Sequence, residues 1–427
     1  MDDEHVHLEE FLLVMDEYAE RPWRLAFKTH LHNVQNCPEC RRRLLNALQL
    51  DDFDSITSQG DPVSAMRRRH RQLKGAMAVA WIEAKPPEER LALIRSQKTL
   101  KNQVVLLGLL DRARELWIEA PQKALGFTEL ALAMLPKLIE SKTDDNEKDE
   151  VHALAWAYHG NVLRILSDLR EADRAFRKAG AALSSMPCDD LVVAEVNALK
   201  ASLRRAQRRY AEAQAAVDKA IRLYGESEEW HLQGQELLTS ASIRCETGDH
   251  VAALADLHRA EPLLDIDNHP RLQWVAASLH LHLLCETGRY AEARDYVPLV
   301  VGLAASHGGI SDLLRVRWCE GRIAAALGPA RSAEEILTET RDGFIDLDMV
   351  YEAALVSLDL AVLYAEQERI RELQVSAQQM VTIFEAHGVE REALAAAVLF
   401  CGAVQHENLT VETLRELQRW LKANRAA

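Results

Sequence analysis

The sequence predicts an all-α protein in which similar helical hairpins stack on one another to form an α-α superhelix. The motif Cys-Glu-Thr-Gly occurs at 245–248 and again at 285–288. Each copy is followed by a short turn and by an alanine at the same offset, Ala253 or Ala293. Aromatic residues make up only 6% of a chain rich in alanine and leucine, a composition that favours helix. A regular period with helical composition is typical of a repeat protein.

One position of each expected first helix is small, or replaces a small residue, and it recurs at a nearly constant interval. Two antiparallel helices approach closely only where a contact residue is small. A glycine is also expected to close three of the first helices, at 248, 288 and 328. The small positions are Gly160, Ala201, Ala241, Leu281, Gly321 and Ala361.

The second helix of each hairpin carries a matching pair of positions. We expect the first to contact the small residue of the first helix, and the larger one to fill the groove between that repeat and the next. A single hairpin cannot bury its apolar face alone, so stacking makes the core continuous. The first set is Ala172, Ala213, Ala253, Ala293, Ala333 and Leu373, and the second is Phe176, Val217, Leu257, Val297, Leu337 and Ala377.

These positions resemble the tetratricopeptide repeat. The openings at 210–213 and 290–293 are similar to the start of the family's second helix. The repeat runs for about 40 residues where the family has roughly 34, so each helix should be longer by a turn. The resemblance implies a right-handed superhelix. The residues that follow the family's Trp, Gly, Tyr, Ala, Phe, Ala spacing are Trp156, Gly160, Leu163, Ala172, Phe176 and Ala179, with leucine in place of tyrosine.

The chain divides into three expected parts. Within the array we expect an early, degenerate hairpin over 100–138 and an exposed charged insertion over 140–150. The parts are an N-terminal helical domain over 1–50, a helical connector over 51–95, and the repeat array with its C-terminal cap over 96–427.

The connector and the cap each have a sequence signal of their own. Pro86 and Pro87 precede two glutamates, which is typical of a helix start. The early hairpin has Ala124 at its small position. A terminal repeat needs a cap with a polar outer face. An amphipathic helix that can close the stack carries Leu414, Leu417, Trp420 and Leu421.

Two cysteines separated by two residues, Cys37 and Cys40, predict a structural zinc site near the N-terminus. Both sulfurs can reach one zinc ion at about 2.3 Å when a turn or helix start lies between them. His32 can supply a third ligand and His7 or His5 a fourth. Three helices of this length bury too little apolar surface to fold alone, and a metal would hold them together. The alternative is a pair of half-buried thiols with surface histidines.

His32, Cys37 and Cys40, followed by a helix of arginines and leucines, resemble the zinc-binding domain of anti-sigma factors over residues 5–50. The usual pattern has three residues between histidine and the first cysteine. Here four follow His32 and six follow His30, so either histidine can be the ligand. The resemblance implies a module that sequesters a transcription factor or derives from one that did.

The resemblance to tetratricopeptide proteins also implies a concave groove lined by first helices. Arginines there could bind acidic side chains, a peptide backbone or a terminal carboxylate, and a tryptophan could be an apolar anchor. Ordinary solvated side chains are the alternative. The expected partner-binding residues are Asn161, Arg164, Arg205, His282, Arg315, Trp318 and Arg322, with Ser202, Ser242, Cys245 and Cys285 at neighbouring groove positions.

Charge and composition exclude several classes of function. A net charge of −15 disfavours nucleic acid and anionic lipid, although a basic cluster over 67–74, interpreted as a solvated helix face, departs from it. No apolar run approaches the roughly 20 residues that span a bilayer, and the acidic N-terminus differs from a signal peptide. The seven cysteines are an odd, scattered set, as in reduced cytosolic proteins. We therefore expect a cytoplasmic protein.

The sequence has none of the common catalytic motifs: no phosphate loop, dinucleotide fingerprint, GxSxG or HExxH. The expected function is a non-catalytic bacterial regulator or adaptor that binds a protein or peptide segment, with a sigma factor as one possible partner. A peptide- or ligand-sensing switch is the alternative, and an enzyme of unrecognised type is a third. The pattern leaves the oligomeric state open.

Overall fold

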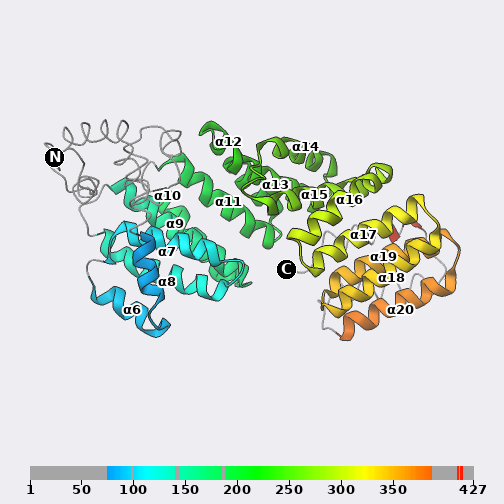
Figure 1. Ribbon diagram of the computed structural model, residues 1–427, viewed down its shortest axis with the longest axis horizontal. Coiled ribbons are helices and arrows are strands. Elements are labelled where there is room, and N and C mark those ends of the chain that lie inside the picture. The colour runs from blue at the N-terminus through cyan, green and yellow to red at the C-terminus, as the bar shows by residue number, and fades with distance from the viewer. Residues whose placement is uncertain are drawn as a thin grey trace, which may run out of the picture. The chain divides into compact units, whose positions relative to one another are not determined.

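The computed structural model describes residues 75–97, 100–139, 145–184, 188–386, 411–412 and 414–416 (Figure 1). The predicted zinc ligands His7, His32, Cys37 and Cys40 lie outside these ranges, as does the N-terminal domain that would contain them. Within the described ranges the regular structure is helical throughout. No helix there combines the length and apolar composition needed to cross a bilayer.

The chain forms two compact units, residues 1–188 and 189–427. In the first unit, a helical segment over 75–83 precedes helices that pack against their neighbours in the chain. These helices are α6 (Pro87–Ser96), α7 (Gln103–Leu116), α8 (Pro121–Ile139), α9 (Asp145–Ile165) and α10 (Leu169–Leu183).

In the second unit the α-helices begin at evenly spaced positions, 190, 210, 230 and so on to 370, so each hairpin has the predicted period. Pro262 ends α14 early in a short 3₁₀ turn. The helices are α11 (Asp190–Ala206), α12 (Tyr210–Glu226), α13 (Trp230–Glu246), α14 (His250–Ala260), η2 (Glu261–Leu263), α15 (Pro270–Glu286), α16 (Tyr290–His307), α17 (Ile310–Leu327), α18 (Ala330–Asp346), α19 (Val350–Glu366) and α20 (Ile370–Ala386).

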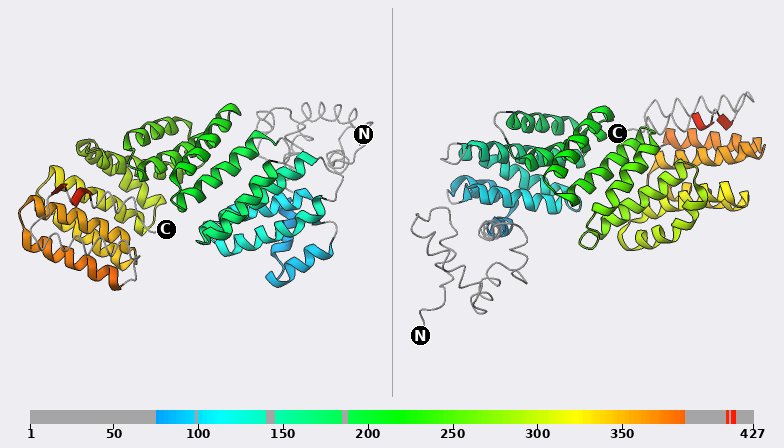
Figure 2. Two further views of the ribbon diagram at one scale, coloured as in Figure 1. Left: turned by 180° about the vertical axis from the view of Figure 1, so that it is seen from behind. Right: turned by 90° about the horizontal axis from the view of Figure 1, so that it is seen from above.

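Successive helices of the second unit pack in pairs, and first helices also contact the first helices of neighbouring repeats. The views in Figure 2 show this arrangement in the helices from α17 to α20, coloured yellow to orange, which lie side by side. The all-α stack of hairpins predicted from the regular period is therefore confirmed.

The small positions of the repeat hold the hairpins together as predicted. Ala201, Ala241 and Ala361 are completely buried. A Cβ added to Gly160 would lie 2.8 Å from the ring of Phe176, and one on Gly321 would lie 2.6 Å from the side chain of Leu337. The large residue thus packs on the small residue of its own hairpin, a contact that the sequence pattern had assigned to the groove between repeats.

Glycine closes first helices at the three predicted positions, but in two ways. Gly248 and Gly288 adopt left-handed φ angles of 82° and 72°. Gly328 is extended and donates its N–H to the carbonyl of Ala324. Arg208, one repeat before Gly248, takes the left-handed conformation without a glycine, at a φ of 57°. The turn is therefore fixed by the stacking of the helices more than by the residue within it.

The flanking regions give one correction. Pro87 opens α6 with two glutamates in its first turn, as predicted. Leu414 is buried in the core cluster of α19 and α20, where a capping helix was expected. The charged segment 140–150 was predicted to be an exposed insertion, but residues 145–150 already belong to α9. The polar composition hid a helix start because a helix needs only one apolar face.

Candidate functional site

The predicted partner-binding residues lie on first helices, and in the second unit these helices contact one another from repeat to repeat: α11 with α13, α13 with α15, α15 with α17, and α17 with α19. A side chain on one first helix can therefore reach the first helix of the next repeat. This neighbourhood brings most of the predicted residues into contact with carboxylates that the sequence analysis did not single out.

Arg322 is the centre of the largest such group. From α17 its Nη1 donates to Oε1 of Glu286 on α15 at 2.7 Å, and its Nε lies 4.0 Å from Oδ2 of Asp359 on α19. All three side chains are at most 14% exposed. Burial opposes the positive charge, but the two carboxylates outweigh it and hold the pKa of Arg322 well above its usual value. One cation therefore links three consecutive repeats.

Trp318 and His282 belong to the same group. The indole N–H of Trp318 donates to Oδ2 of Asp359 at 2.5 Å, and its ring meets Phe344 edge to face with centroids 6.3 Å apart. Trp318 is 9% exposed and lies in a core cluster, so the anchor suggested by the sequence is packed inside the stack. The imidazole of His282 lies 3.7 Å from Glu286.

Arg205 and Arg315 lie in more open surroundings. Arg205 donates to Glu246, one repeat later, at 2.5 Å, and its side chain is 39% exposed. Arg315 pairs with Asp312 at 3.0 Å and approaches Glu352 of the next first helix at 3.6 Å, with 46% of its side chain exposed. These are the two predicted arginines of the second unit that a partner can reach without entering the core.

Asn161 and Arg164 lie on α9 in the first unit. Nε of Arg164 donates to the side-chain oxygen of Asn161 at 3.0 Å. Asn161 is only 2% exposed. This hydrogen bond joins two residues of one helix, whereas the ion pairs of Arg205 and Arg322 join neighbouring repeats.

The carboxylates that pair with Arg205 and Arg322 could have been found from their spacing in the sequence. Glu246, Glu286 and Asp359 each lie about one repeat away in sequence from the arginine they meet. The motif Cys-Glu-Thr-Gly contains two of them, at its second position. The repeat of this motif indicated the period, but the glutamate within it was not predicted to be an ion-pair partner.

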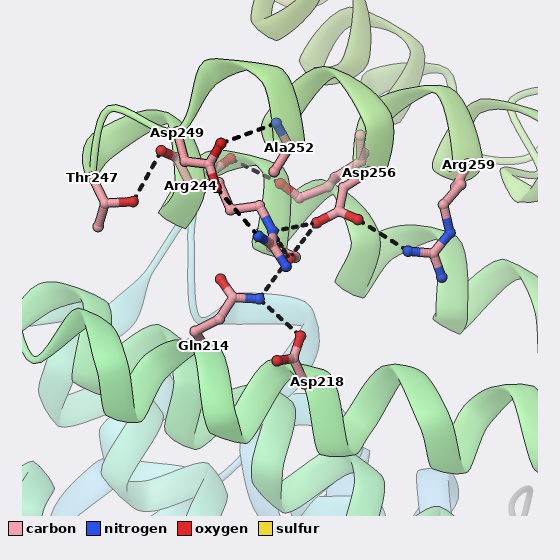
Figure 3. A network of polar contacts seen from close by, with 11 residues as sticks. Gln214, Asp218, Arg244, Thr247, Asp249, Ala252, Asp256 and Arg259 are labelled. Carbon is pink, nitrogen blue, oxygen red and sulfur yellow. Dashed lines mark hydrogen bonds and ion pairs between the residues drawn. The ribbon is translucent and has the colours of Figure 1, made fainter.

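A second polar network, also missed, joins α12, α13 and α14 (Figure 3). Its centre is Asp256, which accepts from the hydroxyl of Ser240 at 2.6 Å and from Nε of Arg244 at 2.8 Å. Arg259 binds the other carboxylate oxygen at 3.0 Å. Gln214 of α12 donates to Ser240 at 2.8 Å. Here an anion, not a cation, holds neighbouring helices together.

Among the described residues, no group of three or more His, Cys, Asp or Glu side chains is arranged to hold a metal ion. In the described part of the second unit, the buried thiols Cys285 and Cys319 lie close enough to interact, and a hydrogen bond from Cys319 lowers the pKa of Cys285. The repeated Cys245 and Cys285 were interpreted as small apolar residues, and Cys285, at 1% exposure, has that environment.

No protein-family model matches the chain. No curated protein matches it either. Several solved structures resemble the chain, and two of them share its fold over most of their length. Aspartyl phosphate phosphatase F from Bacillus subtilis is 14% identical, with 90% of this chain and 97% of that chain covered and a TM-score of 0.51. A Rap protein complexed with Competence and Sporulation Factor is 10% identical, with 75% and 94% covered and a TM-score of 0.52. At such identities the likeness establishes the fold, a tetratricopeptide-like stack of helical hairpins.

Proposed function

We propose that this protein is a non-catalytic regulator or adaptor whose helical array binds a protein or peptide segment. The observation that carries the proposal is the row of charged side chains on adjacent first helices of the second unit, with Arg205 and Arg315 exposed on it. A fold of the same kind has been crystallised with Competence and Sporulation Factor. The bacterial cytoplasm is the proposed location.

The exposed arginines are suited to exchange partners. An ion pair in solvent contributes about 0–1 kcal/mol, so a ligand carboxylate can replace Glu246 beside Arg205 at little cost. A guanidinium can also bind a carboxylate through two parallel hydrogen bonds. Arg322 is different, because its pairs are buried and its removal would disturb the stack. We therefore assign binding to the exposed arginines and support of the helices to Arg322.

A pull-down from native cell extract tests the proposal. The sample is the intact chain carrying Arg205→Glu and Arg315→Glu. The control is Arg222→Glu, on second helix α12, whose side chain is 57% exposed and paired with Glu226 at 2.9 Å. We expect the double variant to lose a partner that the wild type and the control retain. Its melting temperature should fall only modestly, because the new glutamates repel Glu246 and Glu352 from partly exposed positions, and a thermal melt checks that the variant remains folded. Retention of every partner by the double variant would contradict the assignment.

For the N-terminal module we propose a structural zinc held by His7, His32, Cys37 and Cys40, with a sigma factor as partner. The support is the spacing of the cysteines and the resemblance to anti-sigma factors. The test is metal content: a zinc-replete preparation should carry about one zinc per chain, and Cys37→Ser with Cys40→Ser should carry none. Less than about half an equivalent of zinc per wild-type chain, with both thiols freely alkylated, would contradict the zinc site. Co-purification with a sigma factor tests the partner separately.

The second candidate is a peptide-sensing switch, favoured by the way Arg322 links α15, α17 and α19. A ligand that exchanged one carboxylate of this group would change how neighbouring first helices contact one another. Small-angle scattering with and without the captured partner distinguishes the two functions. For a scaffold, the radius of gyration of the complex should equal that expected for the unchanged protein with the partner added. For a switch, it should differ from this value because the curvature of the array itself changes.

A further inference from the structure

The first unit contains a hollow that the proposed function does not use. It lies on α8, α9 and α10 and has a volume of about 570 Å³. Three cationic side chains and two carboxylates line it, around one tryptophan and one histidine. The lining residues are Leu125, Glu129, Trp156, His159, Leu163, Glu171, Arg174, Ala175, Arg177 and Lys178.

The hollow lies on the side of α9 away from the predicted groove. Trp156, His159 and Leu163 are three and four residues apart, which places them on one face of the helix. Asn161 is five residues beyond Trp156, a rotation of about 140°. A ligand in the hollow would therefore contact a different surface from one bound along the first helices.

Lys178 gives the hollow its least compensated charge. Its ammonium lies 3.7 Å from the centre of the Trp156 ring, and within the described residues no carboxylate forms an ion pair with it. Arg177 lies 3.4 Å from Asp173, and Arg174 pairs with Glu171, in pairs whose arginine side chains are over 60% exposed. Such pairs are weak, so both arginines can turn to an incoming anion. The lining has three cations against two carboxylates, and the ammonium of Lys178 is available to an acidic ligand.

His159 adds a hydrogen-bond acceptor. The hydroxyl of Thr128 donates to the carbonyl of Leu125 at 2.9 Å, so its oxygen accepts from Nδ1–H of His159 at 3.0 Å. This tautomer leaves Nε2 of His159 with a lone pair. Burial and the nearby Lys178 lower the pKa of His159 to about 4, so the ring is neutral at physiological pH. The hollow thus offers an anion site and an acceptor for an N–H group.

We propose that this hollow is a second binding site, and that it takes an acidic segment of a peptide. A glutamate or aspartate carboxylate binds Lys178 and the adjacent arginines, its methylene groups pack on Trp156, and a peptide N–H donates to His159. The site is separate from the first-helix surface and stands whether or not that surface binds a partner.

The test uses the full-length chain in anisotropy titrations at low salt with two peptides, acetyl-Leu-Glu-Asp-Leu and acetyl-Leu-Gln-Asn-Leu. Both carry the same fluorescein linker as a C-terminal amide, so they differ only in the two side-chain carboxylates. We expect the acidic peptide to bind at least tenfold more tightly. Lys178→Ala should weaken its binding about tenfold, and Trp156→Leu should weaken it as well. The control is Arg170→Ala, an exposed cation on α10 outside the hollow, which should leave binding unchanged.

Lys178 is exposed, so its replacement should preserve the fold, and a thermal melt of each variant checks this. Equal binding of the two peptides, or equal losses in Lys178→Ala and Arg170→Ala, would overturn the site. Free N-acetylglutamate serves as a competitor. If it binds as tightly as the acidic peptide, the assignment to a peptide is wrong.

Discussion

Helices α9 and α17 place different chemistry at the same position of the repeat. Each is a first helix with glycine at the small position, Gly160 or Gly321, and in each the next residue is polar and little exposed to solvent. In α9 that residue is Asn161, which bonds within its own helix. In α17 it is Arg322, which pairs with helices on both sides. The same backbone position can therefore hold either a neutral hydrogen bond within one helix or an ion pair between repeats.

The two regions should therefore differ in how much unfolding free energy a single substitution removes. A buried hydrogen-bonded amide contributes about 1 kcal/mol. A buried ion pair contributes little relative to an apolar replacement, yet removing one partner is costly because the other charge remains in a poorly solvated place. The α17 region should therefore be much more sensitive to single substitutions than the α9 region.

The largest effect is expected for Arg322→Met. It removes the guanidinium from Glu286 and Asp359, whose side chains are 10% and 14% exposed. Trp318 still donates to Asp359 and His282 still lies near Glu286, so we expect the second unit to lose about 3 kcal/mol of stability. Urea unfolding followed by circular dichroism measures this. The triple variant that adds Glu286→Gln and Asp359→Asn should recover most of the loss. If Arg322→Met were as stable as the wild type, the ion pairs between these repeats would make no measurable contribution to stability.

Acid should affect the α9 region through His159. Burial lowers its pKa from about 6.5 to about 4, so the folded state favours the neutral ring. This stability is present above pH 6.5 and is lost as the pH falls towards 4, because the unfolded chain then binds a proton that the folded chain does not. We expect a loss of roughly 2 kcal/mol, after a discount for partial exposure.

Thermal melts of wild type and His159→Asn at pH 7 and pH 4.5 measure the effect. The asparagine retains a donor for Thr128 but does not titrate, so its pH dependence should be smaller than that of the wild type. Parallel curves for the two proteins would exclude His159 as the cause.

The two glycines sharpen the comparison further. Gly160→Ala would place a methyl 2.8 Å from the ring of Phe176, which is nearly immobile in a packed core, and should cost about 1–3 kcal/mol. Gly321→Ala would place a methyl 2.6 Å from Cδ2 and 2.8 Å from Cγ of Leu337, which is completely buried, and should cost a similar amount. The helix gains about 1 kcal/mol from alanine in both cases. Denaturant unfolding should therefore show a net loss of stability for both variants, and a variant as stable as the wild type would contradict this account.

The stack of hairpins could be predicted from the sequence because its period depends on the size of single residues at the helix contacts. Gly160 and Ala201 recur where helices must touch, and any sequence that stacks in this way must repeat them. The pairing of Arg322 with Glu286 was not foreseen, because the family pattern marks positions on one helix and not contacts between repeats. The hollow at Trp156 and Lys178 was also not predicted, because it forms only where the three helices α8, α9 and α10 meet.

The smallest effect is expected for Arg205→Met, which separates a surface link between repeats from a buried one. Arg205 pairs with Glu246 across one repeat, as Arg322 does with Glu286, but both side chains are more than a third exposed. Water and salt can replace the lost partner, so the change in unfolding free energy should stay below about 1 kcal/mol. A loss as large as that of Arg322→Met would mean that connection between repeats, and not burial, sets the cost of breaking the row.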